Sequence, residues 1–156
     1  MTAWMPRHLV LLLALLWGGQ ALAAEDDAEL VLVVHPDSGV ATLSRSEAIN
    51  IFMGRHRQLP SGITALPVDL APARAEFYQL LADKSLAQIN SYWARLVFSG
   101  RASPPRQAQN AAEVLDIVAN SRGAIGYVRR QDLSANVRPL VGLATWRNMQ
   151  TARTDP

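Results

Sequence analysis

The polar residues best placed for chemistry lie in two short turns, each of which follows an apolar, strand-like run. Ser38 and Gly39 follow the run 30–34, and the corner from Asp69 to Arg74 ends the run 63–70. Ligands of open α/β sheets bind beyond the carboxyl ends of strands and near helix N-termini, where free N–H groups suit anions. We therefore expect a small oxyanion to be held weakly by Ser38, Gly39 and Arg74.

Each of these residues also has a purely structural interpretation. Ser38 and Gly39 are also compatible with a plain turn after a strand. Arg74 stands in the first turn of a predicted helix, where a cation opposes the helix dipole. It therefore either clamps an anion or pairs with Asp69 or Glu76. Asp69 itself suits the cap of the following helix better than a place in a ligand site.

A third candidate lies further along the chain, in the predicted strand 124–128. Tyr127 alternates with Ile125, so it either packs in the core or faces a groove. Gly123 suits the left-handed residue that ends many helices. Gly126, inside the strand, indicates that another group approaches the backbone closely.

Motifs that would indicate catalysis are absent from the sequence. There is no G-x-S-x-G, no Walker loop and no G-x-G-x-x-G. His35 and His56 lie far apart in sequence, with no carboxylates spaced as metal ligands. The cations are not interleaved with aromatic residues as in single-strand nucleic-acid sites. We expect no enzyme, no cofactor, no metal and no nucleic-acid partner.

The first 24 residues read as a signal peptide. Arg7 and His8 precede the apolar run 9–17, and Ala21-Leu22-Ala23 forms a small-x-small cleavage site. An uncleaved anchor is the alternative. The chain has no cysteine, which excludes disulfides and a lipid-modified cysteine, and no later segment is apolar enough to span a bilayer. The sequence thus predicts a periplasmic protein without a membrane span.

Strand-like and helix-like runs alternate after the signal peptide. Ser44 and Glu47 form a capping box at a helix start, Pro72 suits the first turn of another helix, and Asn110 suits the start of a third. The order β-α-β-α-α-α-β, with a possible short last strand at 136–141, predicts an α/β layer structure with a mostly parallel sheet. We expect one domain at 25–146 and a disordered tail at 147–156.

Several segments, taken in order, resemble a known family. They are 43–54, Leu66-Pro67-Val68-Asp69-Leu70, 74–78, 92–100, Pro104-Pro105 and Gly123-Ala124-Ile125-Gly126-Tyr127-Val128. This set is similar to the short, single-domain phosphate ABC transporter substrate-binding proteins. The resemblance implies a type 2 periplasmic-binding-protein fold: a single lobe built as a three-layer α/β/α sandwich.

The resemblance fails at one functional place. Full-length phosphate binders carry Ser-Gly-Thr six residues before a phenylalanine, and this chain has Ala71-Pro72-Ala73 before Phe77. The hydroxyls and the glycine are missing, and Pro72 removes a backbone donor. Arg74 is the substitute that remains at that place.

Two functions follow as hypotheses. The first is a non-catalytic solute-binding module that holds phosphate or another small oxyanion weakly and works with an ABC permease. Its candidate ligand residues are Ser38, Gly39, Asp69, Arg74 and Tyr127. The second is a scaffold module that has lost ligand binding and presents a vacant, apolar ligand face to an envelope protein.

Overall fold

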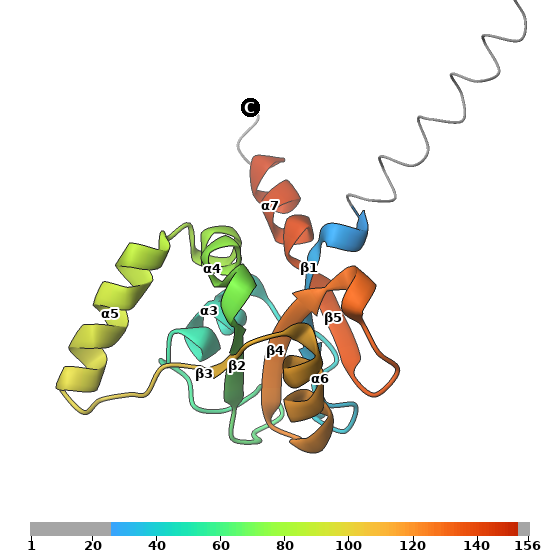
Figure 1. The fold of residues 1–156 in the computed structure, drawn as a ribbon, viewed down its shortest axis with the longest axis horizontal. Helices are drawn as coiled ribbons and strands as arrows, with labels where there is room; N and C mark the ends of the chain where they lie inside the picture. The colour runs from blue at the N-terminus through green and yellow to red at the C-terminus, as the bar shows by residue number, and fades with distance from the viewer. Residues whose placement is uncertain (1–25, 153–156) are drawn as a thin grey trace, which may run out of the picture.

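A computed structural model describes residues 26–152, which form a five-stranded sheet flanked by helices (Figure 1). The strands follow the order β3-β2-β4-β1-β5 across the sheet. Strand β2 is parallel to β3 and β4, whereas β1 is antiparallel to β4 and β5. All strands but β1 therefore run in one direction, which confirms the predicted mostly parallel sheet. The strands are β1 Leu30–Val34, β2 Leu66–Leu70, β3 Arg106–Ala108, β4 Ala124–Arg129 and β5 Arg138–Gly142.

Helices cover both faces of the sheet, so the predicted three-layer α/β/α arrangement is confirmed. On one face the Tyr127 ring of β4 stacks on the Phe77 ring of α4, with centroids 3.6 Å apart. On the other face Gly126 lies against Val114 of α6, which covers the sheet in Figure 1. Helix α5 extends away from the sheet (Figure 1). The helices are α3 Arg45–Phe52, α4 Arg74–Ala82, α5 Leu86–Phe98, α6 Ala111–Asn120 and α7 Leu143–Thr151, with 3-10 turns η1 Ala71–Ala73 and η2 Arg130–Asp132.

The helix starts are set by local side-chain caps. Ser44 and Glu47 form the predicted capping box of α3, and Ser85 forms a second one with Gln88 at α5. Asn110 accepts a hydrogen bond from the Glu113 backbone N–H, 2.9 Å away, and so caps α6. These caps satisfy N–H groups that a helix leaves free in its first turn.

Pro67 shows why strand β2 tolerates a proline. It faces Ile125 of β4, whereas β3 begins to pair with β2 only at Val68. One edge of β2 is therefore free of a neighbour at Pro67, which has no backbone N–H to donate to one.

The far end of the chain differs from the sequence-based prediction. Helix α7 runs through the boundary predicted at residue 146 and includes the first residues of the predicted disordered tail. Leu143 and Trp146 are buried, and this burial holds α7 against the sheet. The predicted signal peptide, residues 1–24, lies outside the described residues.

The two glycines before and inside β4 have different roles from one another. Gly123 is not in the left-handed conformation, so its predicted role as a helix-ending residue is wrong. A Cβ there would lie 2.0 Å from the backbone oxygen of Thr64. The close approach predicted at Gly126 is confirmed, because a Cβ there would lie 2.7 Å from Val114 Cγ1.

We predict that both Gly→Ala substitutions destabilise the chain, and that Gly123→Ala costs more. Val114 can shift to admit a methyl group at Gly126, at a cost of about 1–3 kcal/mol, whereas the Thr64 backbone is fixed by the strand pairing beside it. Urea unfolding measures both. In a double-mutant cycle, Val114→Ala should reduce the cost of Gly126→Ala. A Gly123→Ala cost no greater than that of Gly126→Ala would contradict this account.

Candidate functional site

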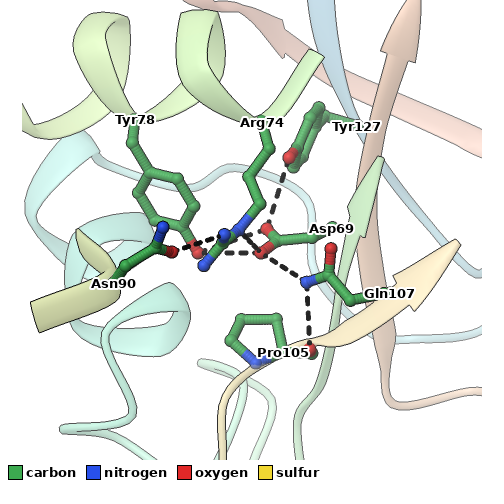
Figure 2. Close-up of polar contacts among 7 residues, drawn as sticks. All are labelled: Asp69, Arg74, Tyr78, Asn90, Pro105, Gln107 and Tyr127. Carbon is green, nitrogen blue, oxygen red and sulfur yellow. Dashed lines mark hydrogen bonds and ion pairs between the residues drawn. The ribbon is translucent and has the colours of Figure 1, made fainter. Parts of the chain in front are cut away.

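A buried carboxylate, that of Asp69, forms the centre of the candidate site (Figure 2). Arg74 Nε donates to its Oδ2 at 2.9 Å, and Gln107 Nε2 donates to the same oxygen at 3.1 Å. The Tyr127 hydroxyl donates to Oδ1 at 3.3 Å, and the Tyr78 hydroxyl lies 3.2 and 3.3 Å from the two oxygens. We call these residues, with Asn90, the Asp69 cluster.

The sheet brings these groups to one level. Asp69 pairs with Gln107 on β3, and the parallel pairing of β2 with β4 sets Tyr127 at the same height on the other side. Asp69 precedes Leu70, the last residue of β2, and after the turn η1 the chain enters α4. Arg74 and Tyr78 stand one helical turn apart on α4, so both reach back to the strand.

Arg74 is held on three sides. Besides its ion pair with Asp69, its Nη1 donates to Asn90 Oδ1 at 2.8 Å, and its guanidinium lies 5.7 Å from the centre of the Tyr78 ring. Glu76, the other partner considered, instead pairs with Arg129 at 2.6 Å. Of the alternatives left open by the sequence, the pairing of Arg74 with Asp69 is the one that the structure has.

Asp69 does not cap a helix. Neither the turn η1 nor helix α4 has a side-chain cap, so the cap interpretation is wrong. The Asp69 oxygens face side chains of β3, β4 and α4 instead. Tyr127 is fully buried with its hydroxyl directed at Asp69, so it belongs to the core and to the cluster together.

Burial controls the protonation of this cluster. It raises the pKa of Asp69 above its ordinary value, although the hydrogen bond from Gln107 and the charge of Arg74 act in the opposite direction. Burial and the nearby Asp69 charge both raise the pKa of the Tyr78 and Tyr127 hydroxyls. The two tyrosines therefore remain protonated donors at neutral pH.

The turn with Ser38 and Gly39 lies at the opposite end of the sheet. Strand β1 runs against β2 and β4, so its last residue, Val34, pairs with Ile125 near the start of β4. The buried Ser38 hydroxyl accepts from the Val40 N–H at 3.3 Å. Gly39 has a φ of 73° and faces Ser61. The structure thus groups Asp69, Arg74 and Tyr127 and separates the Ser38–Gly39 turn from them.

Tyr78, Asn90 and Gln107 belong to the cluster but were not predicted from the sequence. Tyr78 could have been found, because it follows Arg74 at helical spacing. Gln107 reaches the site on β3, a strand that the sequence did not indicate. The sequence gives no sign that Asn90 of α5 would face Arg74.

Residues 26–152 offer few other features that would indicate a function. This part of the chain holds no group of His, Cys, Asp or Glu side chains arranged for a metal ion. It also contains no helix with the length and apolar character needed to cross a bilayer. The apolar vacant face that the scaffold hypothesis expects is not found at the cluster. The large exposed hydrophobic side chains of these residues are Leu66, Val97, Phe98 and Met149.

Comparison with known proteins identifies solved structures with a similar fold. No family model matches the sequence, and no curated protein matches it. The structure is similar to an ABC-type phosphate transport receptor from Vibrio cholerae, with a TM-score of 0.57 and 14% identity over 72% of this chain and 45% of that one. It is also similar to a putative phosphate ABC transporter substrate-binding protein with bound phosphate from Clostridium perfringens, with a TM-score of 0.57 and 13% identity over 72% and 44%.

These similarities confirm the expected fold at the level of architecture. The chain has the fold of part of a phosphate ABC transporter substrate-binding protein, and it spans less than half the length of either matched protein. Identities of 14% and 13% establish the fold alone.

We predict that Asp69 makes the stability depend on pH. Because its pKa is raised on folding, its contribution to the free energy of unfolding is complete below about pH 4 and decreases as the pH rises through the folded-state value. Asp69→Asn cannot titrate. The free energy of unfolding of the wild type minus that of Asp69→Asn should therefore fall as the pH increases. Urea unfolding at a series of pH values measures it, and a difference that rises with pH would show that Arg74 outweighs burial.

Proposed function

We propose that this chain is an exported, periplasmic and non-catalytic module of solute-binding-protein ancestry that has lost anion capture. In this proposal it acts by contact with another component of the envelope. The observation that carries the proposal is the buried Asp69 carboxylate, which accepts hydrogen bonds from Arg74, Gln107 and Tyr127. Asp69 supplies from within the negative charge that an oxyanion ligand would bring.

The donors of the cluster support this proposal because they are already engaged. Arg74, the cation that would clamp an anion, is bound to Asp69 and Asn90. An oxyanion entering here would meet the Asp69 charge at short range, and like charges repel strongly in a buried site. The turn at Ala71–Ala73 has no side-chain hydroxyl to compensate.

Weak capture of phosphate or another small oxyanion, with delivery to an ABC permease, is the second candidate. Two observations favour it: one matched structure is described with bound phosphate, and Arg74 is partly accessible, with 17% of its side chain exposed. Ser38 and Gly39 would not take part at the same site, because they lie at the other end of the sheet.

Calorimetric titration of residues 25–156 with phosphate, sulfate and acetate separates the two candidates. The proposal expects no binding heat with any of them at millimolar concentration. If the wild type binds phosphate and Arg74→Ala abolishes that binding, the proposal is wrong and the second candidate, weak capture of an oxyanion, is supported.

Removing the internal anion should create a site. Asp69→Ala leaves the donors of a buried ion pair without an acceptor and should lower stability by about 3–5 kcal/mol. Formate corresponds to the carboxylate that the substitution removes, and it should raise the melting temperature of this variant but not that of the wild type. Asp37→Ala, which removes an exposed carboxylate at the other end of the sheet, is the matched control and should show no such rescue. Equal effects of formate on both variants would contradict the built-in-anion interpretation.

A further inference from the structure

The end of helix α5 carries an aromatic side chain that the fold leaves uncovered. Phe98, the last residue of α5, is 96% exposed, and its neighbour Val97 is 53% exposed. The helix is attached to the body through Ile89 and Trp93, which are buried. At 3.6 residues per turn Phe98 lies on the opposite side of the helix from Ile89, whereas Val97 lies at the edge of the packed stripe, one turn after Trp93. Figure 1 shows α5 extending away from the sheet, so its end is free to meet an external surface.

Cations surround this apolar end. Arg95 lies three residues before Phe98 and therefore on the same side of the helix. Arg101 follows the helix, and Arg57 donates to its carbonyl oxygen at 3.3 Å. Arg57, Arg101 and Val97 line one hollow beside α5. The apolar side chains are thus flanked by guanidinium groups from two separate segments.

No carboxylate from these segments balances the cations. The stretches 53–68 and 84–112 carry six Lys and Arg residues and no Asp or Glu. Arg95 and Arg101 are exposed, and neither makes an ion pair within the described part of the chain. The ion pairs found among residues 26–152 instead involve acidic residues of three places: the N-terminal segment, strand β2, and helix α4 with the residue that ends it.

We propose that the end of α5 docks onto an anionic lipid surface. Phe98 and Val97 would enter the interfacial layer, while Arg95, Arg101 and Arg57 contact the phosphate groups around them. We choose a lipid surface because its negative charge complements these unpaired cations. A single projecting aromatic ring can enter a lipid layer, which has no shaped pocket to match. This surface contact is separate from the proposed function, because it does not involve Asp69.

Vesicle co-sedimentation of residues 25–156 tests the proposal. Vesicles of phosphatidylglycerol and phosphatidylcholine in equal parts should bind the protein, and pure phosphatidylcholine vesicles should not. Added salt should release it, because surface electrostatics are screened. Absence of binding to the anionic vesicles, or equal binding to both kinds, would overturn the proposal. In the first case an acidic protein surface becomes the alternative.

Three variants locate the contact. Phe98→Ala should weaken vesicle binding by about tenfold, from the apolar area lost. The double variant Arg95→Gln/Arg101→Gln should weaken it by about thirtyfold. Arg138→Gln removes one exposed cation from β5, at the opposite edge of the sheet, and should have little effect. Circular dichroism checks that the variants are folded. Binding that survives Phe98→Ala unchanged, or that Arg138→Gln weakens equally, would exclude the α5 end.

Discussion

The buried carboxylate of Asp69 is the interaction on which this end of the molecule depends. An ion without exposed surface is stable only when donors and an opposite charge surround it. Here they come from Arg74 and Tyr78 of α4, Gln107 of β3 and Tyr127 of β4. Asn90 of α5 then fixes the outer side of Arg74. One side chain therefore sets how two helices and two strands meet around β2.

The same interaction explains the departure from the phosphate-binder pattern at Ala71–Ala73. Without the hydroxyls and with Pro72 in the turn, the helix start offers fewer donors to an external anion. A cation in the first turn of α4 opposes the helix dipole, and the nearby Asp69 offsets this cost directly. The substitutions in the turn and the internal ion pair are therefore mutually consistent. Both leave this corner packed, with its charges and hydrogen bonds satisfied from within the chain.

Local signals in the sequence were sufficient for most elements and insufficient for the site. The caps at Ser44 and Asn110, the apolar run of β1 and the close approach at Gly126 each depend on neighbours in sequence or on one packed helix. The direction of β1 and the existence of β3 depend on pairings between distant segments. Ser38 was assigned to the ligand-binding edge because β1 was taken as parallel to its neighbours, and the antiparallel pairing moves it to the other end. The convergence on Asp69 requires the strand order, which no local pattern contains.

The ion pairs inside the fold also determine which cations are left without an acidic partner at the surface. The partners of Arg45, Arg74, Arg129 and Arg130 are acidic residues of the N-terminal segment, β2 and α4 and its end. The stretches 53–68 and 84–112 around α5 contain no acidic residue, and Arg95 and Arg101 within them are exposed. A corner whose donors are engaged by Asp69 has little capacity left for a ligand. The unpaired cations Arg95 and Arg101 and the uncovered Phe98 lie instead on helix α5, which extends from the body, and in the segment directly after it. The fold thus separates the internally paired Asp69 cluster from the exposed, cationic end of α5.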